Sequence, residues 1–265
     1  MKIPFCKYQG TGNDFIMIDN RNNFFEIKNK SLVEKLCHRR FGIGSDGLIL
    51  IENSLDADFF MRYYNSDGNE GSMCGNGGRC AISYANKLAI IKSETEFYAV
   101  DGLHKGIIHD DEKISLLMQD VSEIKSIKDD FELNTGSPHY IVFVDNLENL
   151  NVFEEGRKIR YNNTYKKAGI NVNFVQIIND KISVRTYERG VENETYSCGT
   201  GVTAVAIVCW SKNLISNKNK IEINTLGGLL ELSLNENKNN YTSIWLKGQA
   251  IKSFTGQIES EDYSN

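Results

Sequence analysis

Proline is almost absent from this sequence, cysteine is sparse, and no long apolar run occurs. Only Pro4 and Pro138 are found among 265 residues, whereas 22 glycines supply the turns. Six cysteines are too few for a disulfide-stabilised scaffold, so each thiol has to be judged by its local setting. Neither a membrane span nor the apolar core of a signal peptide is present. We therefore expect a cytoplasmic protein.

The charge pattern lacks a cluster of one sign. The net charge is −5, and the 30 lysines and arginines are scattered along the chain. Without a basic stripe to displace counterions, a nucleic-acid partner is not expected. With 40% hydrophobic residues, a chain of this length can form two hydrophobic cores, and two domains are the better expectation.

Short apolar runs separated by polar turns predict a protein rich in strands. These runs cover residues 15–18, 48–51, 59–64, 114–118, 141–144, 174–178, 182–187, 221–223, 229–234 and 244–246. The polar stretch 119–134 has the composition of a linker. We expect a first domain over 1–118, completed by a C-terminal strand at about 250–262, and a second domain over 119–250.

Two helices are predicted directly after cysteine-glycine pairs. After Cys74, apolar residues at 81, 84, 85 and 88 form one stripe of a helix, and after Cys198 the run 202–210 is apolar on nearly every side. Such helices have to be enclosed, whereas a third helix over 31–40 is expected to pack outside. The predicted fold is therefore α+β, with two similar domains in which a curved, mainly antiparallel, barrel-like sheet wraps round a central buried helix.

The two cysteine-glycine signals indicate an internal duplication. They lie about half the chain apart, and a polar cluster, at 65–68 and 188–190, precedes each by about ten residues. Residues 13–16 also align with residues 172–175. Equivalent positions in two similar domains would place the active site in the cleft between them.

Cys74 and Cys198 are the candidate catalytic residues. A thiol at the first turn of a helix lies near unsatisfied N–H groups and the positive end of the dipole, which favours its thiolate by about 0.3–1 kcal/mol. Glycines at 75, 77, 199 and 201 leave backbone N–H groups open to an incoming carboxylate. Inversion of an α-carbon needs a base on one face and an acid on the other, so two matched thiols fit that chemistry. The alternative is that both are buried structural cysteines, the reading we keep for Cys6, Cys37, Cys80 and Cys209.

Metal and nucleotide sites are not expected. Gly42–Gly47 has the G-x-G-x-x-G spacing, but it follows a helical stretch and precedes a strand, the reverse of the dinucleotide motif. We interpret it as a helix-to-strand turn. Cys74 and Cys80 lack C-x-x-C spacing, and the four histidines form no ligand pair on a helix face. His139 at a strand start is compatible with a structural role, and Glu188-Arg189 with an exposed ion pair or a substrate clamp.

Six segments together resemble the diaminopimelate epimerase family in order and spacing over almost the whole chain. They are residues 10–15, 65–68, 74–80, 136–139, 187–190 and 197–201. The resemblance implies interconversion of LL- and meso-2,6-diaminoheptanedioate for lysine and peptidoglycan synthesis, without pyridoxal phosphate or any other cofactor. A homodimer is the assembly considered.

The resemblance also assigns roles to individual residues. Cys198 accepts and Cys74 donates a proton in one direction, and His139 and Glu188 tune the thiols. Substrate contacts fall on Asn13, Asn65, Gly75, Asn76, Asn171, Glu188, Arg189, Gly199 and Thr200. Gly47 and Ser137 depart from the family pattern, where some members have glutamine and many have asparagine.

Two alternative functions remain from the sequence. One is a related two-cysteine racemase acting on proline or hydroxyproline, whose substrate has no distal amino-acid end for Glu188-Arg189 to hold. The other is a non-catalytic small-molecule binding protein on the same fold, in which the cysteines only pack.

Overall fold

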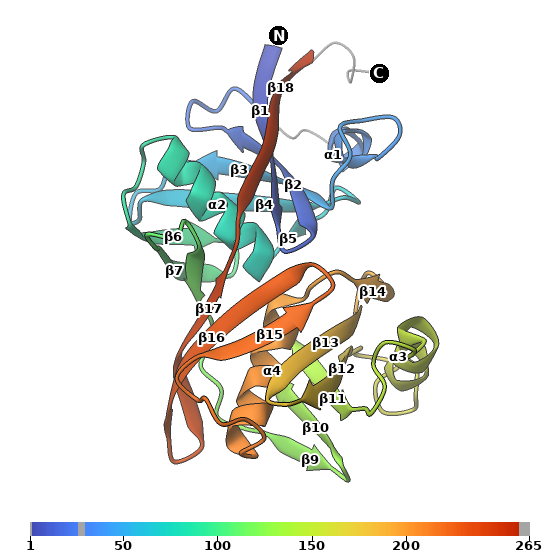
Figure 1. The fold of residues 1–265 in the computed structure, drawn as a ribbon. Helices are drawn as coiled ribbons and strands as arrows, with labels where there is room; N and C mark the ends of the chain where they lie inside the picture. Colours follow the sequence, from blue (N-terminus) through green and yellow to red (C-terminus); the bar gives the residue numbers. More distant parts are fainter. Residues whose placement is uncertain (1, 26–29, 260–265) are drawn as a thin grey trace. The chain divides into compact units, whose positions relative to one another are not determined.

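The structure is a computed structural model that describes residues 2–25 and 30–259. The chain forms two compact units (Figure 1). Unit 1 comprises the described residues up to Leu116 and those from Gly248 onward, and unit 2 spans Leu117–Lys247. The domain boundaries expected from the sequence remain a prediction, and residues 260–262 of the expected last strand lie outside the described residues.

Unit 1 is a curved sheet with one helix inside it and one outside. Its strands are β1 (Lys2–Gly10), β2 (Asn13–Asp19), β3 (Gly47–Glu52), β4 (Phe59–Asn65), β5 (Glu70–Gly71), β6 (Glu94–Ala99), β7 (Gly102–Ile108), β8 (Ile114–Leu117) and β18 (Ile251–Glu259). Its helices are α1 (Lys30–Cys37) and α2 (Gly75–Lys87). β18 pairs antiparallel with β1, which joins the two ends of the described chain in one sheet.

Unit 2 repeats this arrangement. Its strands are β9 (Lys125–Ile127), β10 (Asp130–Asn134), β11 (Pro138–Phe143), β12 (Asn171–Ile178), β13 (Lys181–Glu188), β14 (Asn193–Thr195), β15 (Ile221–Thr225), β16 (Gly228–Asn237) and β17 (Asn240–Gly248). Its helices are α3 (Val152–Arg160) and α4 (Gly199–Ser211).

Strand pairing establishes the internal duplication. β1–β2, β3–β4, β4–β5, β6–β7 and β7–β8 are antiparallel, as are β10–β11, β12–β13, β13–β14, β15–β16 and β16–β17. Each unit has two parallel pairs, β2–β3 and β4–β6 in unit 1 and β11–β12 and β13–β15 in unit 2. The predicted α+β fold of two similar, mainly antiparallel units is confirmed.

The pairing also corrects the alignment of the halves. β11 takes the place of β2, and β12 takes the place of β3, so residues 172–175 do not correspond to residues 13–16. In the observed register, Phe15 faces Gly47 and His139 faces Asn171, which makes Asn171 the counterpart of Gly47. Short alternating strands align in several registers by sequence, and only the hydrogen-bonded ladder selects one.

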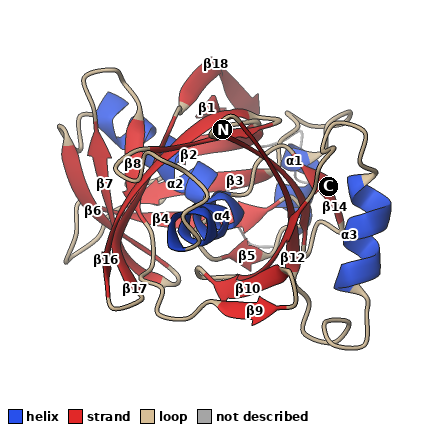
Figure 2. Ribbon diagram, turned by 60° about the horizontal axis from the view of Figure 1, so that its bottom comes forward, coloured by secondary structure: helices blue, strands red, loops and turns tan. Residues whose placement is uncertain are grey.

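The central helix of each unit is enclosed by its own sheet. α2 packs against β1, β2, β3, β4 and β7, and α4 packs against β10, β11, β12, β15 and β16. Figure 2 shows α4 running inside the curve of the unit 2 strands. Residues 202–209 of α4 are all buried, as their apolar run predicts. Both thiol-bearing helices are therefore held rigidly from their sides, with their N-termini at one end of each sheet.

An outer helix covers the opposite face of each sheet. Val33 and Leu36 of α1 pack on Leu48 and Leu50 of β3, while Val152 of α3 packs on Val172 of β12. α1 confirms the expected outer helix, although it ends at Cys37 rather than at residue 40. α3 was not expected, because it is short and polar and buries only Val152 and Gly156.

The prediction of a linker over residues 119–134 is wrong for residues 125–134, which contain two strands. β9 and β10 form a hairpin there, with Lys128 at φ 56° in the turn, and β10 pairs with β11. The stretch is polar in sequence because one face of the hairpin is exposed to solvent. Leu133 is buried and belongs to the core.

Candidate active site

Cys74 and Cys198 occupy equivalent positions, each as the N-cap residue of its central helix. Their backbones are extended, with φ −102° and ψ 144° at Cys74 and φ −120° and ψ 110° at Cys198. The Cys74 Sγ accepts a hydrogen bond from the Gly77 amide at 3.2 Å, and the Cys198 Sγ lies 3.4 Å from the Thr200 hydroxyl. Each sulfur thus lies where the positive end of a helix dipole favours a thiolate.

A buried guanidinium holds the first turn of α2 in unit 1. Arg79 is 0% exposed and donates to the Gly75 carbonyl at 3.2 Å, to the Thr11 hydroxyl at 2.7 Å and to the Asn76 Oδ1 at 2.8 Å. Its Nε also contacts the Gln249 carbonyl at 3.4 Å. All four acceptors are neutral, and burial lowers the pKa of Arg79 to about 10. The charge therefore adds a positive field to the same helix end.

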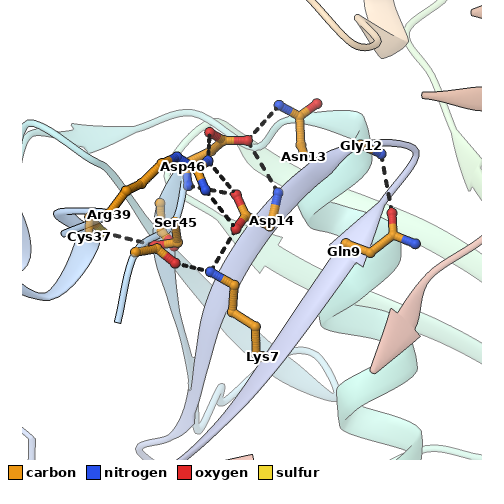
Figure 3. Close-up of polar contacts among 11 residues, drawn as sticks. Lys7, Gln9, Gly12, Asn13, Asp14, Cys37, Arg39, Ser45 and Asp46 are labelled. Carbon is orange, nitrogen blue, oxygen red and sulfur yellow. Dashed lines mark hydrogen bonds and ion pairs between the residues drawn. The ribbon is translucent and has the colours of Figure 1, made fainter. Parts of the chain in front are cut away.

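Asn13 is held at the edge of this turn by an ion network on β1, β2 and the segment that joins α1 to β3 (Figure 3). The Asn76 Nδ2 donates to the Asn13 Oδ1 at 2.5 Å, and the Asn13 Nδ2 donates to the Asp46 carboxylate at 3.1 Å. Arg39 bridges Asp46 and Asp14, and the buried Lys7 Nζ lies 2.7 Å from Asp14. The predicted contacts Asn13 and Asn76 are thus in direct contact, with their amide orientation fixed.

The interpretation of residues 42–47 as a helix-to-strand turn is confirmed, since the segment joins α1 to β3. At Gly47, a Cβ would lie 2.5 Å from both the Tyr63 ring and the Tyr64 carbonyl, so a longer side chain fits only if both the ring and the backbone of β4 shift. The Tyr63 hydroxyl donates instead to the Asn65 Oδ1 at 2.9 Å. The start of β3 and the end of β4 therefore present Tyr63 and Asn65 at this position.

In unit 2, His139 lies against the first turn of α4. It is 0% exposed, with its Nε2 2.9 Å from the Thr200 hydroxyl and its Nδ1 3.1 Å from the Asn173 Nδ2. Burial, with a smaller contribution from the charge of Arg189, lowers the pKa of His139 to about 3. The imidazole is consequently neutral at physiological pH.

A second polar group in unit 2 links Ser137, Asn171 and Arg189. The Asn171 Nδ2 donates to the Ser137 hydroxyl at 2.9 Å, and the Asn171 Oδ1 accepts from the Arg189 amide at 2.8 Å. The Arg189 guanidinium contacts the Ser137 hydroxyl at 3.3 Å and its side chain is exposed. Glu188 is half-buried and accepts from the Thr195 hydroxyl at 2.9 Å. An exposed cation beside a carboxylate suits a zwitterionic ligand.

The residues predicted as site residues occupy matching places in the two units. Asn13 begins β2, and Ser137 directly precedes β11. Gly47 and Asn171 begin β3 and β12, and Asn65 and Glu188 end β4 and β13. The helix starts contribute Gly75 and Asn76 in unit 1 and Gly199 and Thr200 in unit 2. Each unit thus collects its own half of the predicted set at one end of its sheet.

The other four cysteines differ from this pair. Burial raises the pKa of each of these thiols, to about 12 for Cys209, and keeps them protonated. Within residues 2–25 and 30–259, no group of three or more histidine, cysteine or acidic side chains could hold a metal ion. No helix in the same part of the chain is long and apolar enough to cross a membrane.

Several residues of the site were missed by the sequence analysis. Arg79, Asp46 and Asn173 are hydrogen-bonded to the predicted residues Asn76, Asn13 and His139, and Thr186 is hydrogen-bonded to Asn173. Of these four residues, only Asn173 could have been found from the sequence, because an amide in the middle of the apolar run of β12 needs buried hydrogen-bond partners.

Comparisons with solved structures show which known fold this chain has. A phenazine biosynthesis protein of the PhzF family from Bacillus anthracis superposes with a TM-score of 0.75 at 14% identity, covering 98% of this chain and 99% of that one. A hydroxyproline epimerase from Agrobacterium vitis gives 0.69 at 11% identity, covering 97% and 92%. The chain therefore has the two-unit α+β fold that this epimerase shares.

Sequence comparisons give the family. The model of the diaminopimelate epimerase family matches residues 5–124 and 131–252. The diaminopimelate epimerase of Flavobacterium psychrophilum is 56% identical, covering 94% of this chain and 97% of its own length. That of Aquifex aeolicus is 38% identical, covering 98% and 99%. The chain belongs to the diaminopimelate epimerase family, and the predictions of an isomerase with this activity are confirmed.

Proposed function

We propose that the epimerisation of LL- and meso-diaminopimelate by this chain passes the α-proton between Cys74 and Cys198, without a cofactor, and takes place in the cytoplasm. The observation that carries the proposal is the equivalence of the two sulfurs, each the N-cap of the enclosed helix in one of two units of the same topology. Family membership favours this substrate over proline or hydroxyproline.

The proposed reaction uses both thiols in one turnover. One thiolate removes the α-proton, and the electron pair left on carbon is delocalised into the α-carboxylate. The other thiol gives its proton to the opposite face, which inverts the centre and leaves the second sulfur as thiolate. The N–H groups of both helix starts stabilise the carboxylate as its charge grows. This requires both sulfurs to reach one α-carbon.

The remaining predicted residues divide between two tasks. We assign Gly75, Asn76, Gly199 and Thr200 to the reacting carboxylate, and Asn13, Asn65, Asn171, Glu188 and Arg189 to the rest of the substrate. Ser137 contributes through its bonds to Asn171 and Arg189, whereas Gly47 leaves its space to Tyr63. His139 and Glu188 are assigned to tuning the thiols. A homodimer is part of the same proposal.

Incubation in D₂O with each stereoisomer tests the two-thiol assignment. The wild-type protein inverts the centre and incorporates deuterium at the α-carbon. Cys74→Ala and Cys198→Ala should both lose inversion, and any residual exchange should be confined to opposite stereoisomers because each remaining thiol serves one face. Cys209→Ala, which removes a buried thiol of α4, is the control and should keep turnover. Inversion by either single variant at the wild-type rate would refute the assignment.

Alkylation distinguishes an enzyme from a non-catalytic binding protein on this fold. At near-neutral pH, Cys74 and Cys198 should react with iodoacetamide while Cys37, Cys80 and Cys209 stay unmodified, because burial raises the pKa of those three. Unreactive sulfurs at 74 and 198 would support the binding protein instead.

A further inference from the structure

A continuous series of side-chain hydrogen bonds leads from the strands of unit 2 to the sulfur of Cys198. The Thr186 hydroxyl lies 3.0 Å from the Asn173 Oδ1, and the Asn173 Nδ2 lies 3.1 Å from the His139 Nδ1. The His139 Nε2 lies 2.9 Å from the Thr200 hydroxyl, which lies 3.4 Å from the Cys198 Sγ. Thr186, Asn173 and His139 are all buried, so water does not compete for these bonds.

The direction of the first two bonds is fixed by a backbone carbonyl. The Asn173 Nδ2 also lies 3.2 Å from the Tyr140 carbonyl, which can only accept. The amide group facing Tyr140 is therefore the NH₂, and the same group faces the His139 Nδ1. The Thr186 hydroxyl completes the orientation by donating to the Asn173 Oδ1. The His139 Nδ1 consequently accepts, and the ring proton is on Nε2.

The direction continues to the sulfur. The His139 Nε2–H donates to the Thr200 oxygen, which leaves the Thr200 hydroxyl proton for the Cys198 Sγ. The Thr135 hydroxyl donates to the Thr200 carbonyl at 2.8 Å and holds that residue in place. A hydrogen bond donated to sulfur stabilises the thiolate over the thiol.

We propose that Asn173 is a positioning residue that holds His139 as its neutral Nε2–H tautomer, so that His139 acts on Cys198 as a hydrogen-bond donor through Thr200. The inference rests on the proposed function in taking Cys198 as one of the two catalytic thiols. It assigns roles to Asn173 and Thr186, which touch no reacting atom. It also makes His139 a donor in a relay rather than a base.

The charges around His139 agree with a neutral ring. The elements packed against β11 are β10, β12 and α4. Their titratable groups are Asp130 and Glu132 on β10 and Cys209 on α4, with Cys198 at the start of that helix, whereas β12 has none. Asp130 and Glu132 accept from the hydroxyls of Tyr140 and Tyr165, and the charge of Arg189 disfavours a second proton on the ring.

The relay is confined to unit 2. In the matching register of unit 1, Phe15 takes the place of His139 and Ile49 that of Asn173. Arg79 and the Gly77 amide act at the start of α2 instead. Cys74 therefore serves as an internal control for any effect that travels through Asn173.

Nuclear magnetic resonance of ¹⁵N-histidine-labelled protein reads the tautomer directly. With four histidines, the His139 signals are identified by their loss in His139→Gln. We expect the Nε2–H pattern from pH 5 to pH 8 in the wild-type protein. An Nδ1–H or doubly protonated ring at pH 7 would overturn the proposal, and this measurement needs no destabilised variant.

Two variants separate the tautomer from its effect on sulfur. Asn173→Leu should abolish the dominance of the Nε2–H form, whereas Thr200→Val should leave that form intact. Both should slow alkylation of Cys198 by iodoacetamide at pH 7 relative to Cys74 by about tenfold, which corresponds to a rise of one unit in its pKa. Asn224→Leu, on β15, is the matched control and should change neither the His139 tautomer nor the alkylation rate of Cys198.

The outcomes distinguish this inference from the proposed function. An unchanged tautomer in Asn173→Leu, or an unchanged Cys198 rate in Thr200→Val, would overturn the relay even if the protein is an active epimerase. Conversely, both shifts in a protein that exchanges no α-proton would support the relay and refute the function.

Discussion

The close approach of α4 to β12 predicts that Gly201→Ala destabilises unit 2. A Cβ at Gly201 would lie 2.3 Å from the Asn173 Oδ1 and 3.3 Å from the His139 Cε1. Asn173 cannot turn away without losing its bonds to Thr186, Tyr140 and His139. Either α4 moves or that network breaks, and both changes reach Thr200 and the sulfur of Cys198.

Helix propensity and packing act in opposite directions on the stability of Gly201→Ala. Alanine gains up to about 1 kcal/mol over glycine in helix propensity. Overpacking of a rigid core costs about 1–3 kcal/mol, and a buried amide that loses its partner costs about 1–3 kcal/mol more. Subtracting about 1 kcal/mol of propensity gain from a total cost of about 2–6 kcal/mol, we expect Gly201→Ala to lower the free energy of unfolding by about 1–5 kcal/mol.

Gly78→Ala provides the matched control in the first turn of α2. Its Cβ would lie 2.9 Å from the Met73 Sδ and 3.2 Å from the Leu116 Cδ2, both at the ends of side chains rather than in a buried hydrogen-bond network, so the propensity gain offsets the repacking and stability should change by less than about 1 kcal/mol. Urea unfolding followed by circular dichroism compares the two variants, and tryptophan fluorescence reports on unit 2, which holds both Trp210 and Trp245. Equal midpoints for Gly201→Ala and the wild-type protein would refute the reasoning.

Two further predictions concern unit 1. Phe97→Ala removes a ring that stacks on Phe59 with 4.9 Å between centroids, and it should lower the free energy of unfolding in urea by about 3–5 kcal/mol. The control Leu55→Ala, at an exposed position, should change that free energy by less than about 0.5 kcal/mol. Equal effects of the two variants would contradict the assigned core. Asp14→Asn leaves the buried Lys7 uncompensated and should cost about 3 kcal/mol at pH 7. Burial raises the pKa of Asp14, but bonds to Arg39 and Lys7 outweigh it and hold that pKa below its usual range. The stabilisation is therefore complete above the unfolded pKa of about 3.9 and is lost as pH falls through the lowered value, so the two unfolding curves should converge in acid; a constant difference would contradict the ion-pair explanation.

Much of the fold follows from local patterns. All ten apolar runs coincide with strands, apart from Met118 and Val144 at the ends of two runs, and both helices after the cysteine-glycine pairs form as expected. These elements could be predicted because the two-residue period of a strand and the 3.6-residue period of a helix can be recognised in residues that are close in sequence. α3 and the β9–β10 hairpin were not, since mostly exposed elements leave little apolar periodicity to read.

Part of the candidate site could also be predicted from the sequence. The N-cap positions of Cys74 and Cys198 and the duplication followed from glycine placement and spacing. The match of the polar clusters at 65–68 and 188–190 already indicated that Glu188 corresponds to Asn65, and strand register agrees with it. The correspondence of Asn171 with Gly47 was not predicted, because it depends on strand register.

The sequence by itself determined the two thiol-bearing helices, the strand-rich architecture and the chemistry that two matched cysteines permit. The tertiary structure decided which side chains meet them: Arg79 with Asn76 in one unit, and Asn173, His139 and Thr200 in the other. Periodicity fixes which face of a strand or helix is buried, but it does not say which distant element lies against that face. Hydrogen-bond direction between buried groups is set only after folding has brought a donor and an acceptor together.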